Sequence, residues 1–125
     1  MKPIETTNAP AAVGPYSQSI KTGDMLFLSG QVPLSPSTGE IVGDNVTDQA
    51  HQVMKNLSAV LEAAGGSFKN VVKMGIFLKD LEDFGAVNEV YASYLQKPYP
   101  ARACVEVARL PKDVMVEIEA IACIP

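Results

Sequence analysis

Hydrophobic residues recur along this chain with two spacings, one typical of helices and one typical of strands. Between residues 45 and 64, apolar side chains follow one another at steps of three and four, which predicts an amphipathic helix ended by the Gly65-Gly66 pair. A second helix is expected after Asp80, a residue suited to cap it, and before the prolines at 98 and 100. Its expected buried stripe consists of Phe84, Val87, Tyr91, Tyr94 and Leu95.

Segments of alternating pattern predict strands on either side of these helices. Residues 15–20 and 25–32 indicate two strands joined by a tight turn at Gly23, and residues 71–79 alternate as a strand between the helices. Residues 100–120 are interpreted as a closing hairpin of two strands. The order is therefore β-β-α-β-α-β-β, an α+β fold in which two helices cover one face of a four- to five-stranded mixed sheet. With no linker, repeat or low-complexity segment, residues 1–125 are expected to form a single domain.

The closing hairpin is expected to turn one face to the helices and to leave the other uncovered. The residues that alternation places on the helix side are Val105, Val107, Val116, Ile118 and Ala120. The residues expected on the other face are Arg102, Cys104, Glu106, Glu117, Glu119 and Ile121. This face is too apolar for open solvent and too charged for a core, so we interpret it as a subunit interface that contains a polar pocket. We therefore expect a homo-oligomer whose chemistry lies between subunits.

The composition disfavours several classes of partner and cofactor. Ten basic and 14 acidic residues give a net charge of -4, which argues against binding to nucleic acid or to an anionic membrane surface. No apolar run reaches the roughly 20 residues of a membrane span, and the N-terminus lacks a signal-peptide pattern, so a cytoplasmic protein is expected. Two cysteines and one histidine are too few for a zinc site, and neither common phosphate-binding glycine motif is present. We therefore expect no metal and no cofactor.

Arg102 and Glu117 are the strongest candidates for chemistry. A guanidinium binds a carboxylate through two parallel hydrogen bonds, so Arg102 could anchor a small 2-imino or 2-oxo acid. The alternative is a structural salt bridge from Arg102 to one of the nearby glutamates. Glu117 could orient or deprotonate a water molecule, and desolvation would raise its pKa toward a useful range. Its alternative role is to balance the charge of Arg102.

Four other residues could line the pocket, each with a simpler alternative. Cys104 is expected as a small wall residue rather than a nucleophile, because no pattern places the only histidine, His51, beside it. Tyr16 could supply a hydroxyl or a ring wall, and Gly30 would permit close approach of a ligand to the backbone. Strand packing would explain Tyr16 equally well, and a β-bulge would explain Gly30. The amide of Asn88 could reach a pocket, although an exposed helical asparagine is the commoner case.

Long segments of the chain match a family pattern from end to end. They are "NAPAAVGPYSQ", "LSGQVPLSPSTGE" and "PARACVEVARLPKD", followed by "VEIEAIA". In these segments the chain resembles the RidA (YjgF) family of reactive-imine deaminases. The resemblance implies a trimer with a chorismate-mutase-like fold, in which the sheets form a central barrel and active sites lie in clefts between subunits. It also implies the substrates 2-iminopropanoate and 2-iminobutanoate, which water converts to 2-oxo acids and ammonia.

The resemblance assigns roles by position. Arg102 would hold the substrate carboxylate, and Glu117 would position the attacking water. The residues implied to contact or shape the bound acid are Tyr16, Gly30, Asn88 and Cys104. A second hypothesis is a regulatory protein that binds a 2-oxo acid or an amino acid through the same pocket. A ribonuclease that inhibits translation, also described in this family, fits the acidic composition less well.

Overall fold

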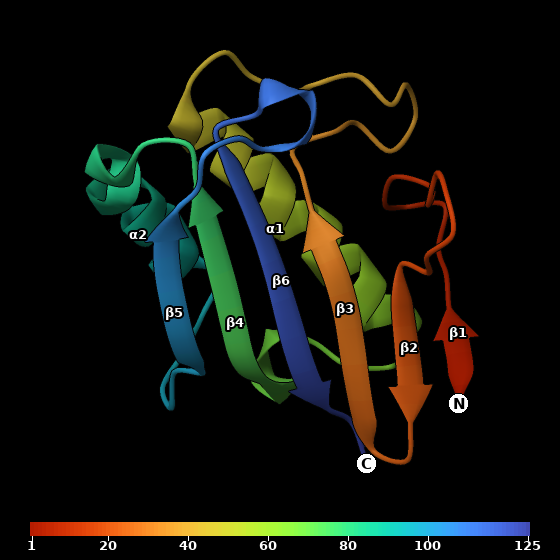
Figure 1. Cartoon of the computed structure of the whole chain (residues 1–125). Helices are drawn as coiled ribbons and strands as arrows, with labels where there is room; N and C mark the ends of the chain where they lie inside the picture. Colours follow the sequence, from red (N-terminus) through yellow and green to blue (C-terminus); the bar gives the residue numbers. More distant parts are fainter.

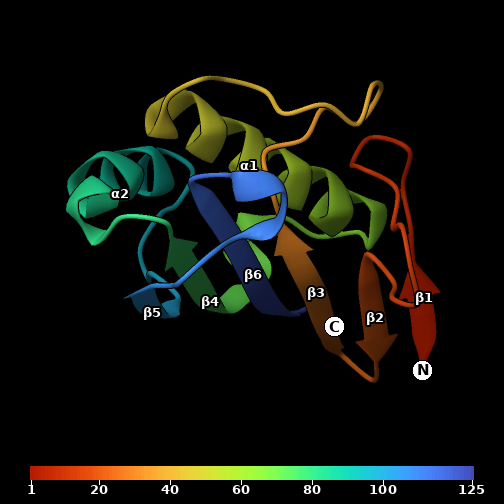
Figure 2. The ribbon, with the colours of Figure 1, turned by 45° about the horizontal axis from the view of Figure 1, so that its top comes forward.

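A six-stranded sheet with two helices on one face forms the body of the protein (Figures 1 and 2). The computed structural model describes residues 1–125. Its strands and helices are β1 (Lys2–Ile4), β2 (Ser19–Thr22), β3 (Met25–Gln31), α1 (Val46–Ala63), β4 (Val71–Leu78), α2 (Phe84–Ser93), β5 (Ala101–Glu106) and β6 (Val116–Cys123). The strand order is β1-β2-β3-β6-β4-β5, and all neighbours are antiparallel except β4 and β5. The predicted α+β class, with both helices on one face, is confirmed.

The sheet has one strand that the sequence pattern did not predict. β1 contains three residues, Lys2–Ile4, which is too short a segment to show alternation. The next strand is also shorter than predicted, because residues 15–18 belong to the loop that precedes β2. Pro15 has no backbone N–H to donate to a neighbouring strand. Neither helix is long and apolar enough to cross a membrane.

Both predicted helices are confirmed; α1 begins at a side-chain cap, and a capped 3₁₀ turn precedes α2. The Asn45 side chain accepts a hydrogen bond from the backbone N–H of Asp48 at 2.9 Å, which caps α1. After α1, Gly65 adopts a φ of 85°, a left-handed conformation that favours glycine. Asp80 caps a short 3₁₀ turn, Leu81–Asp83, that leads directly into α2.

The hydrophobic core lies between the helices and the sheet. Fully buried residues of α1 and of the central strands form one cluster, which includes Val53, Leu57, Leu61, Leu26, Met74 and Ile118. The expected stripe of α2 is only partly buried, because Phe84 is 36% exposed whereas Tyr91 is 5% exposed. The opposite face of the sheet has no helix over it (Figure 2). On that open face Phe27 and Val105 are each 46% exposed.

The prediction of a C-terminal hairpin is wrong. β4 lies between β5 and β6 and pairs with both of them. Residues 107–115 pass over the end of β4, where the N–H of Val107 donates to the carbonyl of Leu78 at 2.9 Å. Hairpin loops usually contain about two to five residues, so this longer connection leaves room for a strand in between. Alternation identifies strands but not their partners, because contacts between distant segments decide the pairing.

The faces predicted for β6 are confirmed, whereas those predicted for β5 are reversed. In the parallel pairing of β5 with β4, Arg102 is level with Met74, a buried residue of β4. Cys104 is level with the buried Ile76, so Arg102 and Cys104 both point toward the helix layer. Val105, predicted to face the helices, lies on the open face instead. β5 is an edge strand with little hydrophobic contrast between its faces, so alternation did not fix its register.

Candidate functional site

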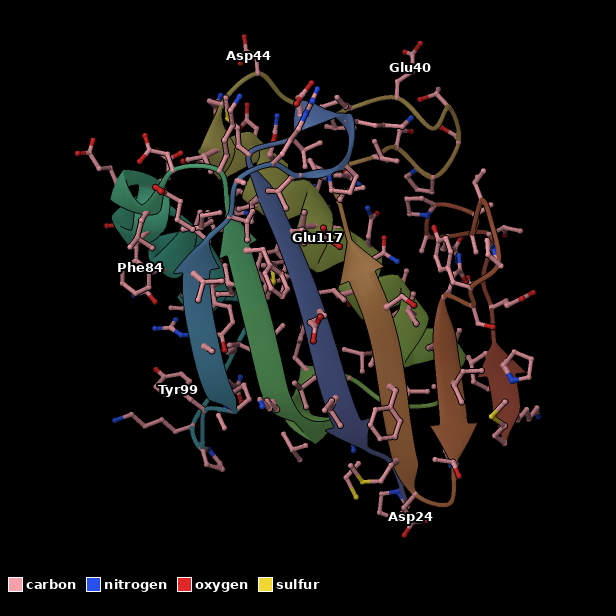
Figure 3. All side chains as sticks on the ribbon, in the orientation of Figure 1. Asp24, Glu40, Asp44, Phe84, Tyr99 and Glu117 are labelled. Carbon is pink, nitrogen blue, oxygen red and sulfur yellow. The ribbon has the colours of Figure 1, made fainter.

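The six predicted site residues fall into two groups on different parts of the chain. The first group, which lines one groove, is Tyr16, Gly30 and Glu117. The second group, on α2 and β5, is Asn88, Arg102 and Cys104. Figure 3 shows Glu117 over the central strand β6, while Tyr99, which lies beside Arg102, is at the β5 edge of the sheet.

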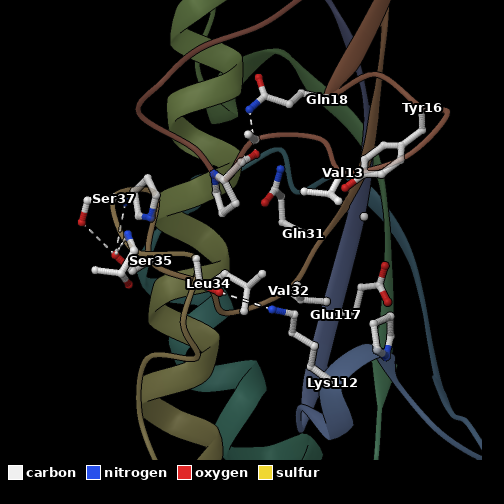
Figure 4. A pocket seen from close by; sticks show the side chains of 17 residues that line it. Val13, Tyr16, Gln18, Gln31, Val32, Leu34, Ser35, Ser37, Lys112 and Glu117 are labelled. Carbon is white, nitrogen blue, oxygen red and sulfur yellow. Dashed lines mark hydrogen bonds between the residues drawn. The ribbon is translucent and has the colours of Figure 1, made fainter.

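The groove of the first group, the Glu117 groove, has a volume of about 960 Å³ (Figure 4). Glu117 enters it from β6, and Tyr16 enters from the loop before β2. Tyr16 is 53% exposed, so strand packing does not explain it. Gly30 lies at a register irregularity of β3, as the bulge alternative predicts. A methyl group at Gly30 would also collide with the Glu117 carboxylate, so glycine at this position leaves room for that carboxylate.

The carboxylate of Glu117 is desolvated and has no ion-pair partner. Burial, and to a smaller extent the negative charge of Glu119, raise the pKa of Glu117 above the usual range of a glutamate. The only ion pair of the chain is Arg109 with Asp113, at 2.8 Å. A carboxylate with a raised pKa is a stronger base, so Glu117 is suited to take a proton from water. Within one chain, Glu117 makes no ion pair with Arg102.

Two residues of the Glu117 groove were missed by the sequence analysis. Gln18 is only 4% exposed, and its side chain ties down the loop that carries Tyr16. It accepts a hydrogen bond from the N–H of Thr6 at 2.7 Å and donates one to the carbonyl of Pro10 at 2.8 Å. Lys112 reaches the groove from a left-handed backbone conformation with a φ of 57°. A glutamine that hydrogen-bonds to loop carbonyls belongs to no periodic pattern in the sequence. Lysine is not a residue type that favours the left-handed conformation, so the sequence does not reveal the backbone conformation of Lys112.

Arg102 is held by α2 and by no carboxylate. Its Nη1 donates a hydrogen bond to Oδ1 of Asn88 at 2.6 Å. The rings of Phe84 and Tyr91 lie 5.3 and 5.1 Å from the guanidinium carbon, measured to their centroids. Arg102 also lines a groove of about 470 Å³ together with Tyr99, which we call the Arg102 groove. The predicted salt-bridge alternative is therefore absent from this structure, and the guanidinium keeps free N–H groups.

Cys104 lies close to Arg102 in sequence but lines neither groove. Its side chain is half-buried against the core. Burial raises the pKa of the Cys104 thiol, and the charge of Arg102 only partly opposes this effect. His51 does not serve as its base, because Nδ1 of His51 is 3.0 Å from the hydroxyl of Tyr94. No cluster of three or more histidine, cysteine or acidic side chains is arranged to hold a metal ion.

The two groups cannot act on one small ligand within a single chain. Glu117 lies on the open face of β6, whereas Arg102 lies on the helix side of β5, and β4 runs between the two strands. Neighbouring strands are about 4.8 Å apart, so the two residues differ by two strand spacings and by the thickness of the sheet. Within one chain, neither group therefore contains both Arg102 and Glu117.

Comparison with known proteins identifies the relatives of this chain. Residues 6–124 match the family described as endoribonuclease L-PSP. A RutC family protein of Pyrococcus horikoshii is 56% identical over 95% of this chain and 94% of its own length. The mouse 2-iminobutanoate/2-iminopropanoate deaminase is 52% identical over 97% of this chain and 90% of its own length. The crystal structure of Escherichia coli TdcF with bound serine superposes with a TM-score of 0.95 at 50% identity, covering 100% of both chains. The chain belongs to the endoribonuclease L-PSP family, which includes the RidA and TdcF proteins.

Proposed function

We propose that this protein is a deaminase that hydrolyses 2-imino acids, such as 2-iminopropanoate and 2-iminobutanoate, to 2-oxo acids and ammonia. The observation that carries the proposal is the pair of complementary groups described above. Arg102 is a guanidinium with no carboxylate partner, and Glu117 is a desolvated carboxylate with no cationic partner. The deaminase name of the mouse relative, which matches nearly the whole chain, supports the same activity.

We further propose that the complete site forms between subunits of a homotrimer. One subunit would contribute Arg102, Asn88 and Cys104, and its neighbour would contribute Tyr16, Gly30 and Glu117. The separation of these two groups within the chain supports this arrangement, as does the uncovered face of the sheet. The three sheets would then line the centre of the trimer, with the helices outside.

Arg102 would bind and orient the substrate carboxylate. Asn88 uses one N–H of the guanidinium, which has five, so an edge remains for two parallel hydrogen bonds to the substrate. The bound imine carbon would then lie at a fixed place relative to a water molecule on Glu117. Holding two reactants in reacting geometry lowers the barrier by removing most of the entropy loss of their encounter.

Glu117 would act as the proton carrier of the reaction. It would take a proton from water as the water oxygen bonds to the carbon of the protonated imine, whose nitrogen thereby becomes a neutral amino group. The carbon then carries one hydroxyl and one amino group. Glu117 would return its proton to the amino nitrogen, the carbon–nitrogen bond would break, and loss of the hydroxyl proton would give the 2-oxo acid and ammonia. These steps consume one water molecule and need no metal or cofactor.

The activity can be tested by coupling the pure protein to a threonine or serine dehydratase, which releases the imines. We expect 2-oxo acid to form faster than by spontaneous hydrolysis, and Arg102→Ala to remove this acceleration while leaving the fold and the oligomer intact. Arg109→Ala is the control for loss of a guanidinium, because Arg109 is exposed and lines neither groove.

Parent-like hydrolysis by Arg102→Ala would contradict the anchoring role of the guanidinium. A wild-type protein that binds 2-oxobutanoate but gives no acceleration would favour the alternative of a regulatory protein that senses small acids.

A further inference from the structure

One face of α2 presents three side chains to Arg102. They are Phe84, Asn88 and Tyr91, which are spaced four and three residues apart and therefore share one side of the helix. Asn88 holds one guanidinium nitrogen at 2.6 Å through its side-chain oxygen. The rings of Phe84 and Tyr91 are not among the six predicted site residues.

Both rings lie within cation–π distance of the guanidinium. The Arg102 carbon is 5.3 Å from the ring centroid of Phe84 and 5.1 Å from that of Tyr91, inside the limit of about 6 Å for a favourable interaction. Planar guanidinium groups also stack well on aromatic faces. Arg102 therefore has three contacts from one helix and none from an acidic side chain.

These contacts restrict the motion of the Arg102 side chain. Arg102 is exposed and projects from an edge strand, and an unrestrained arginine loses much rotamer freedom when it binds a ligand. An acidic partner would restrain it but would also compete with the carboxylate of the substrate. Aromatic rings and a neutral amide restrain the guanidinium without neutralising its charge.

We propose that Phe84 and Tyr91, together with Asn88, form a clamp that holds Arg102 ready to bind a carboxylate. Phe84 and Tyr91 are positioning residues in this scheme, because they act through Arg102. The purpose given to the clamp rests on the proposed function. The clamp itself is a set of contacts that can be observed without any assay of that function.

The ring of Tyr91, rather than its hydroxyl, is the part that matters for the clamp. The hydroxyl oxygen is buried and has no hydrogen-bond partner. Tyr91→Phe keeps the ring and should leave Arg102 where it is. Phe84 is the better position for removing a ring, since it is 36% exposed and its loss leaves no core cavity.

The clamp can be observed by nuclear magnetic resonance of the arginine side chains. The chain has two arginines, so the Nε–H signal of Arg102 is identified by its loss in Arg102→Ala, and Arg109 serves as an internal reference. We expect the Arg102 signal of the wild type to be displaced by the aromatic rings and to report a rigid side chain. Phe84→Leu should move it toward the position of a free arginine, whereas Phe84→Tyr and Tyr91→Phe should not.

Kinetics provide the second measurement. Phe84→Leu should raise KM for 2-iminobutanoate about two- to fivefold with little change in kcat, because the interaction lost is of the strength of an exposed cation–π contact. Phe68→Leu is the matched control, since Phe68 packs on Tyr94, 5.9 Å between centroids, and does not contact Arg102. An Arg102 signal that Phe84→Leu leaves unchanged would overturn the clamp. A signal that moves in a protein without imine hydrolysis would leave the clamp standing and refute the proposed function.

Discussion

Glu117 and Glu119 lie two residues apart on β6, and their environments differ although their chemistry is the same. Glu117 lines a groove beside Gly30, whereas Glu119 is exposed. Burial and the charge of Glu119 both raise the pKa of Glu117. Because a general base must be deprotonated, activity should fall as the pH drops through this raised pKa.

Replacing Glu119 tests the electrostatic part of this argument. Glu119→Gln removes a negative charge, so the pKa of Glu117 should fall and the acidic limb of the kcat/KM profile should shift to lower pH. The plateau at higher pH should change little. A profile of kcat/KM between pH 4 and 8 measures the shift, with Glu89→Gln on the outer surface of α2 as the control. A shift of the acidic limb to higher pH would contradict the role of Glu117 as the base.

Gly30 offers a steric test of the same carboxylate. Gly30→Ala should displace the Glu117 side chain, because a methyl group would collide with its terminal oxygen. We expect a loss of about 100-fold or more in kcat, the usual effect of losing a positioned base, with the fold retained. The matched control is Gly75→Ala, where the added methyl group would lie 3.2 Å from Cγ of Glu119 instead. Equal activity of the two variants would show that the position of Glu117 does not matter.

At the scale of elements, the Glu117 groove depends on a loop that has little regular structure. The loop between β1 and β2 forms one wall of the groove, and Gln18 fixes it through hydrogen bonds to Thr6 and Pro10. A buried amide that satisfies loop backbone groups is costly to remove, because its partners then lack hydrogen bonds inside the protein.

Gln18→Ala should therefore loosen this loop. We expect a decrease of about 1–3 kcal/mol in the free energy of unfolding, measured by urea titration. Backbone amides of residues 6–9 should exchange with solvent faster, and kcat/KM should fall because Tyr16 is no longer held. Gln96→Ala is the control, since Gln96 is exposed and makes no side-chain hydrogen bond. Unchanged amide exchange in Gln18→Ala would show that other contacts hold the loop.

The elements that were predicted correctly from the sequence are those determined by residues close to one another along the chain. The beginning of α1 follows from Asn45, and its end follows from the Gly65-Gly66 pair. The wrong predictions concern contacts between distant segments, namely the pairing of β5 and the face on which Arg102 lies. The six candidate site residues came from residue chemistry and family resemblance, whereas Phe84 and Gln18 emerged only from the structure. Helical spacing places Phe84 in the buried stripe of α2, because spacing alone does not distinguish a core contact from a contact with Arg102.

At the scale of the whole molecule, the chain has one covered and one uncovered sheet face. Phe27 and Val105 are exposed on the uncovered face, which also carries the half-buried Glu117 and the exposed Glu119. Large apolar side chains gathered with polar groups on one surface are typical of subunit interfaces. We therefore expect a trimer in solution, with three times the 13.3 kDa mass of the chain, measured by light scattering.

Mixed oligomers test whether the sites are shared between subunits. Arg102→Ala and Glu117→Gln should each be inactive alone. In randomly mixed trimers, roughly a quarter of the interfaces join an intact Arg102 to an intact Glu117, because each neighbour is of the required type half the time. Activity should return to about that fraction of the wild-type value after co-expression or joint refolding. A mixture as inactive as its components would contradict shared sites.

The position of β4 between the strands that carry Arg102 and Glu117 has a consequence for how such a catalyst would behave in the test tube and in the cell. A lone folded chain would possess both reactive groups and yet be inert. Turnover per milligram would then decline on dilution, as the assembly dissociates, and would recover on concentrating the same sample without any refolding.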